Sequence, residues 1–228
     1  MILAVIDTST RFAGVGAMDD AGNRSTRAWR SNQNHGRELM PALIECLDEL
    51  SLAPTDITHV AVALGPGGFS AVRVGISATL GLVVAKQLPV LGIPTHDIEV
   101  EPHRAQIATD RPVYSLLPAG RNELSWARHG ANADRETGMS APDVFVEGLE
   151  SGALLCGEAC DLVVGLVERS RFAEPATSGA GESAGTRDPN SIIDIARASF
   201  GAGGTTPYEE LRPIYARPPS ISTPKPPR

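Results

Sequence analysis

The sequence predicts an α/β protein of two lobes, each built on a mixed β-sheet flanked by helices. Short runs of branched apolar residues, typical of buried strands, alternate with longer amphipathic stretches in the first half of the chain. A second group of strand-like runs follows in the other half. We therefore expect an N-terminal lobe over residues 1–100, a divergent C-terminal lobe over 101–217 and a disordered Pro-rich tail over 218–228.

Three strands joined by tight turns open the chain. The apolar run Ile2–Ile6 predicts a fully buried strand. Ala13–Met18 and Ser25–Trp29 predict two more, with the turn residues Asp19–Asn23 between them. Such a succession forms an antiparallel meander.

Helices and strands alternate through the rest of the first half. Apolar residues recur at helical spacing over Asn34–Leu50, where Asn34 is the expected N-cap, and a second helix is expected over Phe69–Ala85. The strands Thr58–Leu64 and Leu88–Ile93 precede and follow that second helix. A strand–helix–strand step implies a right-handed crossover between parallel strands. The complete order is that of a ribonuclease-H-like core, the unit repeated in actin-like (ASKHA) proteins.

The second half of the chain has a less regular pattern. A mobile loop is expected over Glu174–Asn190, which is rich in small residues. The other expected elements are strands over Val113–Leu117, Leu124–Arg128, Val144–Val146 and Ala153–Cys156, and helices over Ala159–Arg169 and Ser191–Phe200.

The composition excludes several classes of protein. Lys and Arg number 20 against 27 Asp and Glu, so the formal charge of −7 argues against direct strong binding of tRNA. The three cysteines are too few for a disulfide framework. No basic residue precedes the apolar N-terminus, and we expect no apolar stretch long enough to cross a membrane. The sequence therefore predicts a cytoplasmic protein without membrane contact.

The turn after the first strand is one candidate site. Asp7, Thr8 and Ser9 provide a carboxylate and hydroxyls that could hold a phosphate or a metal-bound water. The same side chains could equally serve only to hydrogen-bond the turn backbone. A nuclease is disfavoured because Thr58–Leu64, the expected neighbouring strand, contains no carboxylate.

A glycine-rich turn before the second helix is another candidate. Gly65, Gly67 and Gly68 lie where free N–H groups and the helix dipole favour an anion. The segment lacks the Lys-Ser/Thr pair of a P-loop and the glycine spacing of a dinucleotide-binding turn. A phosphate or nucleotide loop and a purely structural turn both remain open.

A ridge of small residues follows along the Phe69–Ala85 helix. Small ridges allow another helix to approach closely. Val72 and Ile76 belong to a separate inward apolar face, so we expect the ridge to receive a partner helix. Leu39 and Leu43 of the preceding helix are expected to flank this interface. The ridge consists of Ala71, Gly75, Ala78, Thr79 and Leu82.

Histidines and cysteines form no standard metal motif. The stretch Thr95–His103 combines histidines with acids, but its spacing fits no zinc site, and we expect a solvated loop. Cys156 and Cys160 are not a standard metal pair either. The sequence therefore predicts no metal, no other cofactor and no catalytic residue.

Several of these segments together resemble the TsaB family, in that family's order and at its spacing. The most specific is Gly65-Pro66-Gly67-Gly68-Phe69-Ser70. In the second half, Gly157-Glu158-Ala159 resembles a Gly-acid-small turn, but Pro118 stands where the family usually has an acid. The other matching segments are Ile2–Thr10, His35–Pro41, Pro89–Ile93 and Pro213–Arg217.

This resemblance implies a supporting role rather than a reaction. TsaB-like proteins pair with the related enzyme TsaD through two helices of the first lobe. With the ATPase TsaE, that assembly transfers a threonylcarbamoyl group to an adenosine beside the tRNA anticodon. TsaD holds a metal through two histidines, and Thr95 and Glu99 stand at the corresponding positions here. The implied protein is a non-catalytic dimerisation subunit that forms a heterodimer with TsaD, or a homodimer when alone.

Two enzymatic functions are the alternatives. An actin-fold ATPase or phosphotransferase would use Asp7 and the Gly65–Gly68 turn, and would bind nucleotide as an isolated chain. A glycoprotease-like metallopeptidase is a weaker alternative, because the paired histidines are missing.

Overall fold

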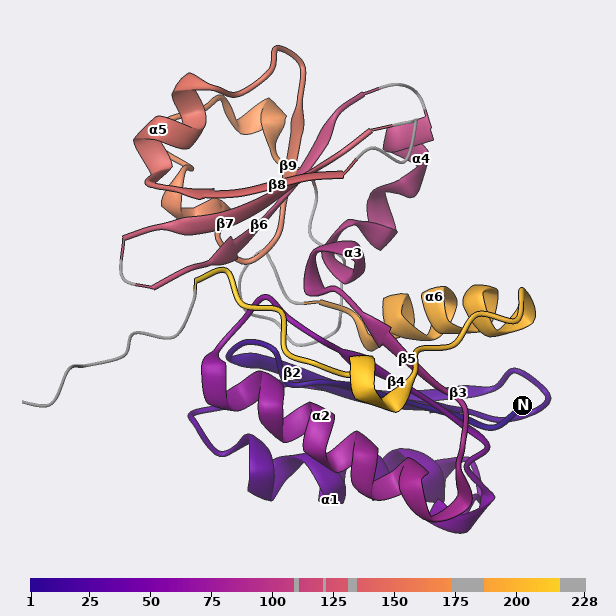
Figure 1. The fold of residues 1–228 in the computed structure, drawn as a ribbon. Helices are drawn as coiled ribbons and strands as arrows, with labels where there is room; N and C mark the ends of the chain where they lie inside the picture. The colour runs from indigo at the N-terminus through magenta and orange to yellow at the C-terminus, as the bar shows by residue number, and fades with distance from the viewer. Residues whose placement is uncertain (109–110, 121, 131–134, 174–186, 218–228) are drawn as a thin grey trace, which may run out of the picture.

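Two lobes, each built on one sheet, lie one above the other (Figure 1). The structure is a computed structural model that describes residues 1–108, 111–120, 122–130, 135–173 and 187–217. It confirms the predicted α/β architecture of two lobes with mixed sheets. The predicted tail and most of the predicted mobile loop lie outside the described residues.

The first sheet has the strand order β3-β2-β1-β4-β5. Its first three strands form the predicted antiparallel meander, and β1 pairs in parallel with β4, as β4 does with β5. The central strand β1 is buried at all five residues, as its apolar run predicts. The strands are β1 (Leu3–Asp7), β2 (Phe12–Met18), β3 (Arg24–Arg30), β4 (His59–Ala63) and β5 (Val90–Ile93).

Helices cover both faces of this sheet (Figure 1). α1 (His35–Glu49) and α2 (Phe69–Val83) lie on one face, where Leu39 and Leu43 join the main apolar core. α6 (Pro189–Gly201) covers the other face, although it comes from the second half of the chain. The domain boundary expected at residue 100 assigns α6 to the second lobe, whereas α6 packs on the sheet of the first lobe.

The second sheet has the order β8-β7-β6-β9, with β6 antiparallel to β7 and parallel to β9. α3 (Thr95–Val100) and α4 (Arg104–Ala108) connect the first lobe to it, and α5 (Pro142–Glu147) packs on its other face through Phe145. Its strands are β6 (Val113–Pro118), β7 (Leu124–His129), β8 (Arg135–Ser140) and β9 (Leu154–Cys156). Short 3-10 helices occur at Pro54–Asp56, Val84–Lys86, Glu101–His103, Cys160–Leu162, Arg169–Arg171 and Tyr208–Glu210.

Three predictions for the second half are wrong or incomplete. The expected strand Val144–Val146 lies inside α5, whose start is set by Pro142 at its first position. The expected helix Ala159–Arg169 is a series of turns closed by i→i+3 hydrogen bonds, such as that from the Val163 amide to the Cys160 carbonyl. The strand β8 was not anticipated, because this edge strand has no alternating apolar pattern.

The expected solvated loop Thr95–His103 is also wrong. It begins with α3 and continues as a 3-10 turn, and Thr95, His96 and Glu99 are all buried. Pro94 precedes the helix, and its carbonyl accepts a hydrogen bond from the Asp97 amide. Because α3 lies where the chain crosses between the lobes, polar residues that look solvent-facing in the sequence become enclosed.

Among the described residues, one helix is long and apolar enough to cross a membrane, contrary to the sequence-based expectation. The 18 residues Phe69–Lys86, which comprise α2 and the following turn, have a mean hydropathy of 1.4. The inward side of α2 packs on the first sheet through Val72, Ile76 and Val83. We therefore interpret it as a helix of the packed α/β lobe that leaves the apolar side chains of Phe69 and Val84 exposed.

Candidate functional site

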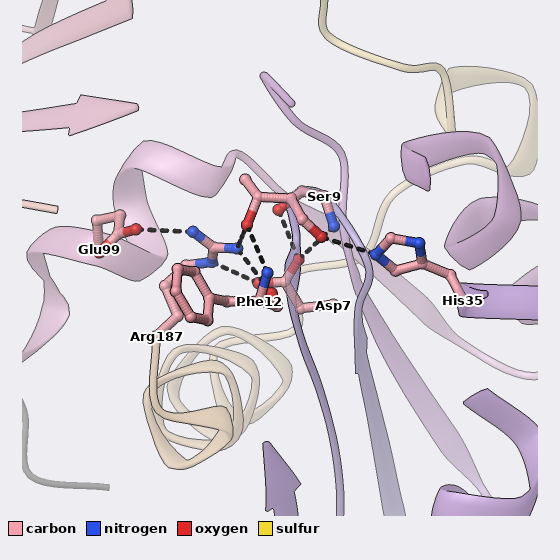
Figure 2. Close-up of polar contacts among 7 residues, drawn as sticks. Asp7, Ser9, Phe12, His35, Glu99 and Arg187 are labelled. Atoms are coloured by element: carbon pink, nitrogen blue, oxygen red, sulfur yellow. Dashed lines mark hydrogen bonds and ion pairs between the residues drawn. The ribbon is translucent and has the colours of Figure 1, made fainter. Parts of the chain in front are cut away.

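The turn that follows β1 is held entirely by protein groups. The Ser9 amide and hydroxyl both donate to Asp7 Oδ1, at 2.8 and 2.6 Å. The Thr8 hydroxyl donates to the Ala71 carbonyl in the first turn of α2, at 2.6 Å. His35 Nε2, at the start of α1, lies 2.8 Å from the Thr10 carbonyl oxygen (Figure 2). The candidate residues of this turn therefore anchor both helices, which favours the structural alternative.

The other oxygen of Asp7 is bound by an arginine that the sequence did not single out. Arg187 lies just before α6, and its Nε donates to Asp7 Oδ2 at 2.6 Å (Figure 2). Its two terminal nitrogens reach Glu99 Oε1 at 2.7 Å and Thr10 Oγ1 at 2.8 Å. The Phe12 carbonyl accepts a further hydrogen bond at 3.1 Å. With 2% of its side chain exposed, Arg187 fills the space between the lobes at this point.

Carboxylates surround this guanidinium. Burial raises the pKa of Glu99 to about 7, against the opposing effect of Arg187. Burial alone would lower the pKa of Arg187, but Asp7 and Glu99 outweigh it and raise that pKa. Arg187 therefore stays charged. The site is a buried ion-pair cluster that joins Glu99, where the chain leaves the first lobe, to Arg187, where the chain returns to it.

A third carboxylate, Glu158, follows β9 in the second lobe. It is 3% exposed, and burial raises its pKa against the influence of Arg187. Neither of its oxygens has a hydrogen-bond partner among the described residues. Glu158 thus brings a third acidic group to this region, and burial favours its protonated form.

The glycine turn lies against the Asp7–Ser9 turn, as a shared site would require. The Gly68 amide donates to the Ser9 carbonyl at 2.7 Å. A Cβ atom on Gly67 would collide with the same carbonyl oxygen, so glycine is needed there for close approach. Gly65 lies at the other end of the turn, and its carbonyl accepts a hydrogen bond from the Thr95 amide. These contacts explain the glycines by packing, without a bound anion.

A cavity of about 1300 Å³ opens between the lobes beside these turns. The start of α2, which has no side-chain cap, forms one wall of it. Glu158 and the turn at Pro118–Gly120 form the opposite wall, from the second lobe. The C-terminal segment closes part of the rim, where Tyr215 stacks on Phe69 with ring centroids 4.9 Å apart.

The predicted partner ridge is only partly on the surface. Gly75 and Thr79 are buried, and a Cβ on Gly75 would lie 2.6 Å from the Thr8 hydroxyl. Leu39 and Leu43 are also buried in the core, so the expectation that these four residues present a surface is wrong. At Gly75 the physical reason is the close approach of the Thr8 side chain, and Leu39 and Leu43 lie on the side of α1 that packs in the core. Half-buried positions remain at Ala71, Ala78 and Leu82.

The residues at the positions of the metal-binding histidines do not fit a metal. The Thr95 hydroxyl is buried without a partner among the described residues, and Glu99 is paired with Arg187. Within the described part of the chain, no group of three His, Cys, Asp or Glu side chains is arranged to hold an ion. The donor set here is therefore unlike a metal centre.

A second buried polar cluster was missed in the sequence. His96 of α3 lies 2.8 Å from Ser115 Oγ through Nδ1 and 3.0 Å from Ser125 Oγ through Nε2. Ser115 Oγ is also 3.1 Å from Nε2 of His129. Burial is the main cause that lowers the pKa of His96 to about 3 and that of His129 to about 4. This network of uncharged, hydrogen-bonded side chains connects α3 to the second sheet.

Comparison with known families relates a central part of the chain to a known family. The family model described as "TsaD: tRNA N6-adenosine threonylcarbamoyltransferase" matches residues 30–145, just over half of the chain. The chain is 28% identical over 177 residues to a tRNA N6-adenosine threonylcarbamoyltransferase of Anaeromyxobacter dehalogenans. That match covers 76% of the chain but 50% of the relative, so the chain spans about half the length of such transferases.

Other similar proteins match over nearly their whole length. The tRNA threonylcarbamoyladenosine biosynthesis protein TsaB of Escherichia coli is 24% identical over 232 residues, with 95% of both chains covered. The solved structure of YeaZ from Pseudomonas aeruginosa superposes with a TM-score of 0.73 at 20% identity. It covers 94% of this chain and 99% of YeaZ, and at this identity it supports the fold alone.

Proposed function

The chain belongs to the family of TsaD threonylcarbamoyltransferases and their TsaB homologues, and we propose that it is a non-catalytic subunit in tRNA threonylcarbamoyladenosine biosynthesis. Its partner would be a TsaD protein, joined by TsaE in a larger assembly. In isolation the same surface would pair two copies of the chain. We place this function in the cytoplasm, as the sequence leads us to expect.

The outer side of α2 is the observation that carries the proposal. Only 28% of the residues in Phe69–Lys86 are buried, although the segment is apolar. Val84 is 56% exposed, and Ile44 of the neighbouring α1 is 40% exposed. Apolar surface that a chain leaves open in this way is typical of a protein interface. We therefore place the partner helix on the outer side of α1 and α2, where Ile44 and Val84 are the exposed large apolar residues outside the first turn of α2.

The absence of catalysis is supported by the state of Asp7. In an actin-fold phosphotransferase this position would have to serve a nucleotide or its cation. Here both carboxylate oxygens are engaged, one by Ser9 and the other by Arg187. The acidic net charge is compatible with a subunit that leaves tRNA contacts to its partner.

Charged substitutions on the proposed face test the interface. We expect Ile44→Glu and Val84→Glu to weaken binding of TsaD from the same source by roughly tenfold or more, because each buries a carboxylate on association. Isothermal titration calorimetry measures the affinity, and circular dichroism checks that each variant folds.

Val144→Glu is the matched control, since Val144 is 57% exposed but lies on α5 of the second lobe. We expect it to bind TsaD as the unsubstituted chain does. If all three variants bind equally well, the α1–α2 face is not the interface. Equal weakening by all three would indicate a general effect of charge.

The ATPase or phosphotransferase alternative retains one favourable feature, the uncapped start of α2 at the interlobe cavity. It requires that the isolated chain bind ATP or ADP. Calorimetry of the chain with each nucleotide decides the matter: measurable binding supports the enzyme, and its absence supports the subunit. The metallopeptidase alternative requires a bound metal, which elemental analysis of the purified protein detects.

A further inference from the structure

The environment of Arg187 has the form of a binding site for a planar cation. Four oxygen atoms surround the guanidinium, and two of them belong to carboxylates. All the donor–acceptor distances lie between 2.6 and 3.1 Å. A guanidinium presents five donors in one fixed plane, and an ammonium cannot match several separated acceptors in this way. The four acceptors are Asp7 Oδ2, Glu99 Oε1, Thr10 Oγ1 and the Phe12 carbonyl oxygen.

The acceptors come from separate parts of the chain. Asp7, Thr10 and Phe12 belong to β1, β2 and the turn between them, in the first lobe. Glu99 belongs to α3, where the chain leaves for the second lobe, and Arg187 lies where it returns to α6. The ion pair between these two residues therefore ties the outgoing crossing to the incoming one.

Acidic groups outnumber the arginine in this site. Asp7 and Glu99 are both in contact with Arg187, and Glu158 acts on it electrostatically from the second lobe. Unpaired carboxylates in a buried site are costly, so the site without a cation would take up protons or another positive group.

We propose that this acidic pocket between the lobes is a guanidinium-binding site whose resident ligand is Arg187, and that its occupation fixes the two lobes relative to each other. The cation that joins the two lobes is thus a side chain of the protein itself.

Chemical rescue tests the site. We expect Arg187→Ala to lower Tm by roughly 10 °C, as for loss of one partner from a buried ion pair in a chain of this size. Guanidinium chloride at low millimolar concentration, far below the molar range that denatures proteins, is expected to recover more than half of that shift. Tetramethylammonium and sodium chloride at equal ionic strength should not, because neither cation donates hydrogen bonds.

Arg24→Ala is the control, because Arg24 makes a surface ion pair with Asp194 outside the pocket. Its Tm should not rise in guanidinium. Two outcomes overturn the proposal: equal recovery of Arg187→Ala by all three cations, or recovery by none of them.

Arg187→Lys keeps the test decisive if the alanine variant does not fold. The lysine side chain retains the charge but not the planar fork, so we expect a folded protein with a lower Tm that guanidinium does not raise. A lysine variant as stable as the original chain would overturn the recognition of a guanidinium.

Hydrogen exchange tests the second part of the proposal, the fixing of the lobes. In whichever Arg187 variant folds, amides of the two crossings, residues 94–100 and 187–190, should exchange faster than in the original chain. In Arg187→Ala, guanidinium should slow them again. Unchanged exchange at both crossings would show that the pocket binds a cation without holding the lobes.

Discussion

Two buried polar clusters share the short helix α3, but they are stabilised in different ways. Glu99 joins the cluster of Arg187, in which burial raises the pKa of the carboxyl and the ion pair opposes that shift. His96 joins the cluster of Ser115 and Ser125, in which burial favours the neutral ring. The comparison shows that burial favours the uncharged form of both groups, and that a counter-ion opposes this effect only at Glu99.

The clusters also respond to pH in opposite directions. Burial raises the pKa of Glu99 from 4.5 to about 7, so its contribution to stability is present at low pH and is lost as the pH rises through about 7. The pKa of His96 is lowered from 6.5 to about 3, so its contribution is present above pH 6.5 and is lost as the pH falls toward 3. A short helix thus combines two groups that favour opposite conditions.

Removing the cation from the charged cluster is expected to have the largest effect. Arg187→Met should cost roughly 3–5 kcal/mol of unfolding free energy, because it leaves Asp7 and Glu99 buried without a partner. The triple variant Arg187→Met, Asp7→Asn, Glu99→Gln should recover much of that loss, since both carboxylates that contact Arg187 are then replaced by neutral amides. Urea denaturation measures both variants. A triple variant that is no more stable than Arg187→Met would mean that packing, rather than charge, dominates.

Acidification is expected to lower the stability of the protein through the neutral cluster of His96 and His129. When the pH falls from 7 to 5, we expect His96 to lower the free energy of unfolding by about 2 kcal/mol, and the less buried His129 to lower it somewhat less. The reason is that both histidines take up protons in the unfolded chain over this range but stay neutral in the folded chain. Thermal unfolding across this range measures the slope. In His96→Leu the slope should be shallower, and Glu99→Gln should make it steeper by removing the opposing group. Identical slopes in all three proteins would contradict these assignments.

Much of the first lobe could be predicted from the sequence. Ile2–Ile6 and Thr58–Leu64 are apolar runs flanked by turn residues, and the structure places β1 and β4 there. Such elements are set by local patterns that burial reinforces. In the second lobe Val144–Val146 carried a strand-like pattern, but the start signal of Pro142 and the packing of Phe145 decided for a helix.

The charged cluster could not be predicted, because its members are far apart in the sequence. Asp7 was a candidate, but Arg187 lay in a segment expected to be mobile, and Glu99 in one expected to be solvated. One local signal was available: Asp188 and Pro189 form the N-cap and first turn of α6, which places Arg187 immediately before an ordered helix. Which carboxylates it would meet depends on how the two lobes pack, and no local pattern contains that information.

The smallest expected effect comes from one hydroxyl of the neutral cluster. Ser125→Ala removes the hydrogen bond to His96 Nε2 but leaves the bond from Nδ1 to Ser115 intact. Because one ring nitrogen then loses its partner in a buried site, we expect a loss of roughly 1–2 kcal/mol, measured by urea denaturation at pH 7. Combining Ser125→Ala with His96→Leu should cost little more than His96→Leu alone, since both changes disrupt the same hydrogen bond. Fully additive losses would show that the two residues act independently and that the cluster is not a connected network.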